Sequence, residues 1–296
     1  MTNALTATTL VAPTTTSRAR RFIRRHQNVL IIWGVLVFVF IISALVSESF
    51  TGPRNLINLS RQSAALALVA IGQTFVLLSA GIDLSVGSTV SLIVVVMAAI
   101  MEPTPESMFL TTLVGLGIGV GAGLFNGLAV TRLKVSPFMV TLATLSIVRG
   151  LALQLRQQPQ ATIPNEFSPY FTGEFIGLPI PFIITIVTTT LAAILLRHTR
   201  FGRHIYAVGS NEVSTRLSGM PTDRIKVMAY MACGFMTGLA GIYWAARSRA
   251  GDPLSGENFA FDSVTAVVLG GTSLFGGAGS VWGTLAGVLV IGILGN

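Results

Sequence analysis

Long apolar runs alternate with short polar stretches along most of this chain. A membrane-crossing helix needs about 20 apolar residues, and most of the runs are near that length. The run at 263–275 is shorter and rich in glycine. The pattern therefore predicts an all-α fold, a polytopic transmembrane helical bundle of about nine membrane segments with glycine-broken elements. The predicted segments are 29–46, 63–80, 86–101, 109–130, 136–155, 178–196, 227–246, 263–275 and 279–295.

The composition supports a membrane protein. Hydrophobic residues make up 52% of the chain and charged residues only 10%, whereas soluble domains carry about 25% charged residues. Intrinsic disorder requires low hydrophobicity and high charge, so the composition excludes that class too.

The net charge of +8 is spread over short stretches between the apolar runs. A nucleic-acid-binding face needs a dense basic surface with aromatic residues, and the sequence shows none. Basic stretches at 131–135 and 197–226 and acidic stretches at 101–108 and 157–177 alternate as the positive-inside rule requires for a cytoplasmic N-terminus. Four arginines would lie outside, against this trend: Arg54, Arg61, Arg247 and Arg249.

The two ends of the chain differ from its interior. Residues 1–28 are polar and basic, and we expect a disordered cytoplasmic tail there. A cleaved signal peptide is disfavoured because the run at 29–46 is long and has no clear cleavage site. Residues 29–296 form the predicted transmembrane domain. The chain stops abruptly after Gly295 and Asn296, which suggests that a final helix is missing.

Glycines recur at four-residue spacing in several predicted helices, and this spacing places them on one face where two helix backbones approach closely. Static helix packing is favoured over a sliding surface. The packing stripes are Gly115, Gly119, Gly123 and Gly127; Gly234 and Gly238; and Gly279, Gly283 and Gly287.

An acidic residue, Asp83, lies between two apolar runs and is flanked by Gly81 and Gly87. A charge at membrane depth must face a polar cavity, a partner or backbone donors. Asp83, followed by Ser85, is also suited to capping the next helix. The two roles are compatible, and both remain open. The glycines indicate a broken or re-entrant element.

A second glycine-interrupted segment, 261–279, resembles the first in character. Paired broken elements in the two halves of a transporter often mark the transport pathway. By this analogy the candidate pathway residues are Asp83, Ser85, Thr272 and Ser273.

The polar stretch 197–226 contains a predicted short helix at 210–219. Its start is capped by Ser210 or Asn211, Glu212 complements the helix dipole, and Gly219 suits the end. Such a helix is too short to cross a membrane and needs a surface to pack against. Its small apolar face favours docking of a cytoplasmic partner over a position on lipid headgroups.

The sequence contains no recognisable catalytic or metal-binding constellation. Cys233 is the only cysteine, and His26, His198 and His204 are not clustered within the apolar runs. Neither lysine, Lys134 or Lys226, follows a glycine as an ATP-binding loop requires. We therefore expect a non-catalytic membrane subunit without a metal or cofactor of its own.

Four separated motifs resemble the permease subunits of bacterial ATP-binding-cassette (ABC) importers for ribose, xylose, related monosaccharides and autoinducer-type furanones. These permeases belong to a wider family that includes branched-chain amino acid permeases. The resemblance runs from about residue 29 to the end, and the first motif favours the sugar branch. The motifs are GIDLSVGS at 81–88, GRHIYAVGSNE at 202–212, RLSG at 216–219 and VVLGGTSL at 267–274.

The resemblance implies about ten membrane helices in the bacterial inner membrane, translocation of a monosaccharide, and a second permease copy, identical or different. It also implies cytoplasmic subunits that bind ATP and a periplasmic or lipoprotein sugar-binding protein. The chain departs from the family in its longer N-terminal tail and absent last helix. The segment around 211–219 resembles the helix that couples permease to ATPase. The implied coupling residues are Ser210, Asn211, Glu212, Arg216, Leu217 and Gly219.

Besides a receptor or scaffold subunit, two alternatives remain. One is an ABC permease for another small solute, such as an autoinducer furanone, a branched-chain amino acid or a nucleoside. The other is a carrier driven by an ion gradient, which would predict several acids inside the membrane, whereas Asp83 stands nearly alone.

Overall fold

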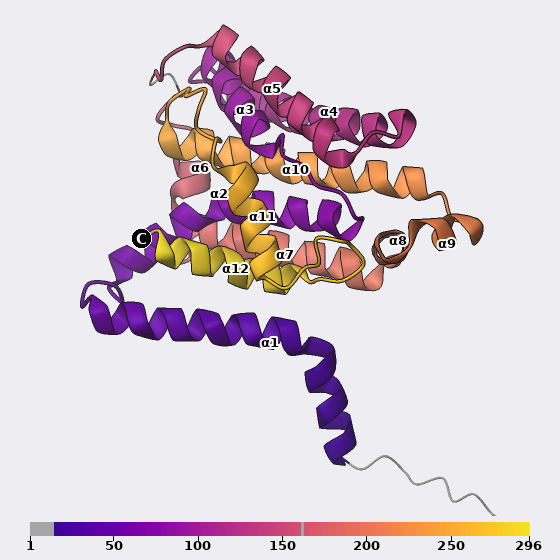
Figure 1. The fold of residues 1–296 in the computed structure, drawn as a ribbon. Coiled ribbons are helices and arrows are strands. Elements are labelled where there is room, and N and C mark those ends of the chain that lie inside the picture. Colours follow the sequence, from indigo (N-terminus) through magenta and orange to yellow (C-terminus); the bar gives the residue numbers. More distant parts are fainter. Residues whose placement is uncertain (1–14, 161–162) are drawn as a thin grey trace, which may run out of the picture.

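The computed structural model describes residues 15–160 and 163–296, and these residues form an almost entirely helical bundle (Figure 1). A minimal antiparallel hairpin of β1 (Glu174–Phe175) and β2 (Leu178–Pro179) is the exception within the described residues. The helices are α1 (Thr15–Val46), α2 (Pro53–Leu78), α3 (Val86–Ile100), α4 (Pro105–Leu133), α5 (Pro137–Leu155), α6 (Pro169–Thr172), α7 (Ile180–His198), α8 (Arg200–Ser210), α9 (Glu212–Leu217), α10 (Thr222–Ser248), α11 (Phe259–Leu269) and α12 (Val281–Leu294).

Six helices in the described ranges are long and apolar enough to cross a membrane, and α3, α11 and α12 are shorter apolar helices. Together they correspond to the nine predicted segments, so the all-α polytopic prediction is confirmed. At about 1.5 Å per residue, the 11 residues of α11 extend only about 16 Å. This helix is one of the expected broken elements.

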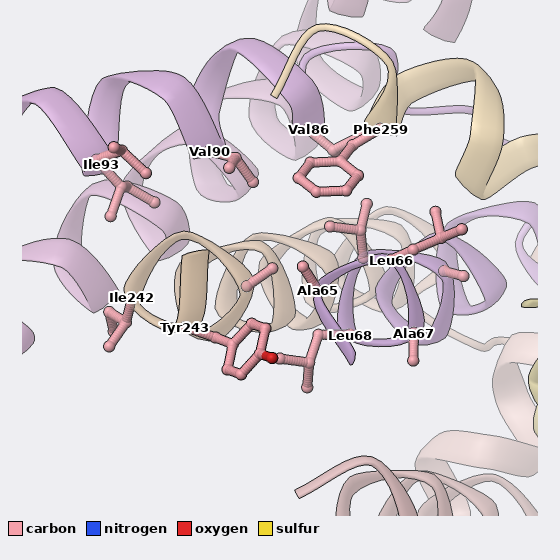
Figure 2. Close-up of a cluster of buried hydrophobic side chains, with 14 of the residues drawn as sticks. Ala65, Leu66, Ala67, Leu68, Val86, Val90, Ile93, Ile242, Tyr243 and Phe259 are labelled. Atoms are coloured by element: carbon pink, nitrogen blue, oxygen red, sulfur yellow. The ribbon is translucent and has the colours of Figure 1, made fainter. Parts of the chain in front are cut away.

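The centre of the bundle is α2, whose residues from Ser63 to Leu78 are all buried. A helix that is apolar on every side belongs inside a larger assembly of helices. Figure 2 shows part of this core, where Leu66 of α2 lies near Val86 of α3 and Phe259 of α11. By contrast, many large apolar side chains of α4, α5 and α7 point outward, as expected for helices that face lipid.

Helix α2 begins at Pro53, ten residues before the predicted segment. Proline is favoured in the first turn of a helix because its missing N–H is not needed there. Arg54 and Arg61 consequently lie on the helix. The Arg61 guanidinium donates to the carbonyl oxygen of Thr172 at 3.1 Å, so this arginine is held within the protein.

Helix α1 already begins at Thr15, so it includes the second half of the stretch 1–28, for which a disordered tail was expected. The segment from Thr15 to Trp33 contains neither glycine nor proline, so nothing in it interrupts the helix. The first 14 residues of the expected tail lie outside the described residues.

The stretch 197–226 also holds more structure than predicted. Besides the expected short helix, it contains α8, which begins after an N-cap in which the Thr199 hydroxyl accepts from the Gly202 N–H at 3.1 Å. One face of α8 is buried against the bundle, including Ile205 and Val208. Figure 1 places α8 and α9 together at one end of the bundle.

Candidate functional site

The glycine stripe of α4 lies directly against α10. A Cβ atom on Gly119 would collide with the carbonyl oxygen of Gly234 and come within 2.8 Å of the Gly238 nitrogen. A Cβ on Gly127 would lie 2.9 Å from the Val227 Cα. The backbones of α4 and α10 are therefore in contact along this stripe, as the four-residue spacing predicts. A Cβ on Gly117 or Gly121, on the opposite face of α4, would meet no atom of another segment within 4 Å.

The second stripe packs α12 against α11, but only two of its three predicted glycines take part. A Cβ on Gly283 would collide with Gly270, and one on Gly287 would collide with the Ala266 carbonyl. Gly279 does not belong to the stripe, because it precedes the helix in a loop. The φ of 156° at Gly279 lies in a region that favours glycine. A Cβ at this position would collide with the side chain of Thr272.

The carboxylate of Asp83 is the centre of a buried polar cluster between α2 and α3. Its Oδ1 accepts from the backbone N–H of Ser85 at 2.9 Å and from the Ser85 hydroxyl at 2.7 Å. The Asn126 amide of α4 donates to both carboxylate oxygens at 3.2 and 3.3 Å. Asn126 in turn accepts from the Thr144 hydroxyl of α5 at 2.6 Å. We call Asp83, Ser85, Asn126 and Thr144 the Asp83 cluster.

The backbone at this helix break is also held from several helices. Tyr230 of α10 donates its hydroxyl to the Ile82 carbonyl at 3.1 Å. With its amide oriented to suit both groups, Gln73 of α2 bonds to the N–H and the carbonyl of Asp83, each at 3.2 Å. The polar groups that an interrupted helix exposes are thereby satisfied within the protein, as a membrane interior requires.

Asp83 therefore supports the start of α3 without being its N-cap, a position that Ser85 occupies without a capping bond from its side chain. Sequence reasoning missed Asn126 and Thr144. Both are polar residues inside apolar runs, and that placement was the available signal.

The two glycine-broken segments meet in the structure. The N–H of Gly277 donates to the carbonyl of Leu78 at 3.1 Å, and Gly276 lies against Ala80, which has a positive φ of 60°. Ser273 closes this loop by donating its N–H to the Ala278 carbonyl at 2.8 Å. Thr272 is buried, and its hydroxyl has no hydrogen-bond partner among the described residues. The contact is between the two backbones, and in the part of the chain that the structure describes no hydrogen bond joins Asp83 or Ser85 to Thr272 or Ser273.

The predicted short helix is α9, and Asn211 is its cap. The Asn211 side chain accepts from the Ser214 N–H at 2.9 Å, whereas Ser210 is the last residue of α8. The helix ends at Leu217, and the φ of 80° at Gly219 just beyond it allows the Met220 N–H to reach back to the Thr215 carbonyl at 3.3 Å.

An ion-pair network attaches α9 to the start of α10. Glu212 pairs with Arg216 at 3.0 Å and with Lys226, and Arg216 also pairs with Asp223 at 2.6 Å. Partial burial raises the pKa of Glu212, but hydrogen bonds and charge from Lys226 and Arg216 outweigh it, so the pKa lies below its ordinary value. The carboxylate is thus ionised at neutral pH, and the network orients α9.

The apolar side chains of α9 point away from the protein. Val213 is 69% exposed and Leu217 is 84% exposed. They are four residues apart and so lie on one face of the helix. Helix α9 is therefore held by its ion pairs on one side and exposes two apolar side chains on the other.

A second charged pair lies within the apolar part of the molecule, and sequence reasoning missed it. Arg149 of α5 donates to Glu257, just before α11, at 2.9 Å. Arg149 stands inside the predicted segment 136–155, so an arginine in an apolar run was the overlooked signal. Asp83 is therefore less isolated than the sequence suggested.

These features define a polytopic membrane permease, in which closely packed helices enclose broken elements. The chain belongs to the family described as the branched-chain amino acid transport system / permease component, whose model matches residues 55–296.

Several curated proteins are similar to this chain over most of its length. The ribose import permease protein of Bacillus subtilis is 40% identical over 266 residues, which cover 89% of this chain and 82% of that protein. The ribose import permease protein of Escherichia coli K12 is 38% identical, with coverages of 89% and 83%. The D-allose transport system permease protein of Escherichia coli K12 is 32% identical, with coverages of 88% and 80%. The comparison with solved structures finds no match.

Proposed function

We propose that this chain is the transmembrane permease subunit of an ABC importer that carries a monosaccharide across the bacterial inner membrane. The similarity to ribose and allose permeases over nearly nine-tenths of the chain is the observation that carries this proposal. In this arrangement α1 enters from the cytoplasm, so that α8 and α9 also lie on the cytoplasmic side.

The energy for transport comes from separate subunits that bind and hydrolyse ATP, since the chain has no glycine-rich loop that ends in lysine. A sugar-binding protein delivers the solute outside, and a second permease copy completes the membrane part. The docking element for the ATPase is α9. Its exposed Val213 and Leu217 suit an apolar groove on a partner, and its charged network holds the helix in one orientation.

The decisive test is uptake of radiolabelled D-ribose into proteoliposomes that contain the permease with its ATPase and binding-protein partners. Uptake should require ATP on the side of the membrane where the ATPase subunits are bound. Uptake that continues without nucleotide and follows an ion gradient would contradict the proposal and favour a secondary carrier.

Replacing Leu217 by aspartate should uncouple ATP hydrolysis from uptake. The side chain is 84% exposed in the isolated chain, so the fold should tolerate the change, whereas a charged group in an apolar docking groove is unfavourable. We expect uptake to fall by about tenfold or more, the size of effect seen when a central interface residue is lost. Glu212→Gln and Arg216→Gln should reduce coupling less, because exposed ion pairs contribute little each.

Arg224→Gln is the matched control, because Arg224 is exposed on the first turn of α10 next to α9 but outside the ion-pair network. Its uptake and stimulated ATP hydrolysis should equal those of the wild type. Normal coupling in Leu217→Asp at normal membrane expression would exclude α9 as the docking helix.

A further inference from the structure

A small cavity lies between the start of α3, the middle of α5 and the segment that leads into α11. Its volume is about 240 Å³. Leu84, Leu145 and Phe261 form apolar walls, while Ser88 and the Arg149–Glu257 pair supply polar groups. Clefts of about 300–1,000 Å³ hold drug-sized ligands, so this one suits a smaller solute.

The cavity lies at membrane depth. Gly87, near the start of α3, is in van der Waals contact with Gly256, since a Cβ on either residue would collide with the carbonyl of the other. The Gly256 N–H also donates to the Ser91 hydroxyl at 2.9 Å. The far end of α3 at Ile100 is 13 residues from Gly87, or about 20 Å along the helix. Glu257, next to Gly256, is therefore well inside the bundle.

The charged pair at this depth is not sealed within the protein. The side chain of Arg149 is 44% exposed and that of Glu257 is 52% exposed. Their bond joins Nη2 to Oε1, which leaves further N–H groups of the guanidinium and the second carboxylate oxygen for another partner. Hydrocarbon would be a poor environment for such groups, so this side of the cavity must face water, solute or protein.

The cavity wall is held by the Asp83 cluster. Leu84, which lines the cavity, stands between Asp83 and Ser85, and both of these are bonded to Asn126. The candidate pathway residues Asp83 and Ser85 thus position the wall, while Arg149 and Glu257 reach the space itself.

We propose that this cavity is a solute subsite for one neutral sugar ring, in which Arg149 donates to and Glu257 accepts from sugar hydroxyls while Phe261 and the leucines cover the apolar face of the ring. The inference rests on the proposed function and assigns to it the residues that contact the solute. A subsite built on one charged pair and few further polar groups binds weakly, which suits a passage that must also release its solute.

The first test replaces each member of the pair in the assembled transporter, as Arg149→Gln and Glu257→Gln. Both variants keep a hydrogen-bonding side chain, and Glu257→Gln also keeps the length of the original one, so both should fold. We expect the KM for radiolabelled D-ribose uptake to rise by about tenfold, as expected when a charge-assisted hydrogen bond is lost. Unaltered uptake kinetics in both variants would overturn the subsite, whereas failure of the wild type to import any sugar would overturn the proposed function instead.

The second test does not depend on transport. Leu254 lines the cavity and is 43% exposed, so Leu254→Cys should react with a water-soluble methanethiosulfonate reagent, and D-ribose or D-allose should slow that reaction. The native Cys233 is fully buried and should not react with the reagent. Val213→Cys on α9 is the control, since Val213 is 69% exposed but does not line the cavity, and neither sugar should slow its reaction. Absence of protection by either sugar would contradict the proposal.

Discussion

Replacing Gly119 by alanine should strongly destabilise the protein, because a methyl group there has no space. The added Cβ would collide with the carbonyl oxygen of Gly234 and lie 2.8 and 2.9 Å from the nitrogen and Cα of Gly238. These are backbone atoms, so no side chain can rotate away, and α4 and α10 must move apart. Overpacking usually costs about 1–3 kcal/mol, and a contact between two backbones belongs at the upper end.

Gly121→Ala provides the matched control on the same helix. Gly121 has no atom within 4 Å of the position of a Cβ, so alanine should fit there. Alanine also favours a helix over glycine by about 1 kcal/mol, and the variant should be at least as stable as the wild type. Thermal unfolding of both variants in detergent, followed by size-exclusion chromatography, measures the difference. Equal midpoints for Gly119→Ala and Gly121→Ala would show that α4 and α10 are not in contact at Gly119.

Exchanging Asp83 and Asn126 should restore a stability that each single replacement removes. In Asp83→Asn, an amide group would face the Asn126 amide, so two buried donors would compete for too few acceptors. In Asn126→Asp, two carboxylates would face each other across the Ser85 hydroxyl, which can donate to only one of them. Each single variant should lose about 1–3 kcal/mol or more, the usual cost of a buried polar group left unpaired.

The double variant Asp83→Asn/Asn126→Asp again pairs one amide with one carboxylate. The Thr144 hydroxyl, which donates to Asn126 at 2.6 Å, has an acceptor in either arrangement. A double-mutant cycle on thermal unfolding measures the coupling between the two positions. Losses that simply add in the double variant would show that Asp83 and Asn126 do not interact as described. Comparing uptake in the double variant with its stability then separates the structural role of Asp83 from any role in transport.

Local sequence patterns predicted several features that the structure contains. The glycine spacing on α4 indicated a packing face, and the turn around Gly219 matched the end of α9. Other features depended on distant residues. Asp83 is bonded to Asn126, 43 residues away, and Arg149 to Glu257, 108 residues away. A local pattern does not reveal which of the polar residues in apolar runs will meet.

The helix boundaries also depended partly on local sequence and partly on the packing of the bundle. Helix α8 was not predicted because basic residues interrupt its apolar ones. Phe201, Ile205 and Val208 stand at helical spacing, which was the available local signal, but only the bundle shows that this face is covered. Helix α1 begins earlier than hydropathy indicated, since hydropathy marks the length that lipid can cover and not the length of the helix.

The sequence by itself determined that this protein is a multi-pass helical bundle with two broken elements and one short exposed helix. Hydrophobic length, glycine spacing and capping residues are local properties, and the membrane restricts them to few outcomes. Only the tertiary structure decided that the two broken elements meet at their backbones, that Asp83 is bonded to Ser85, Gln73 and Asn126, and that a charged pair borders a small cavity. Such contacts join residues that are far apart in the chain, so they arise from how the helices pack and not from any stretch of sequence alone.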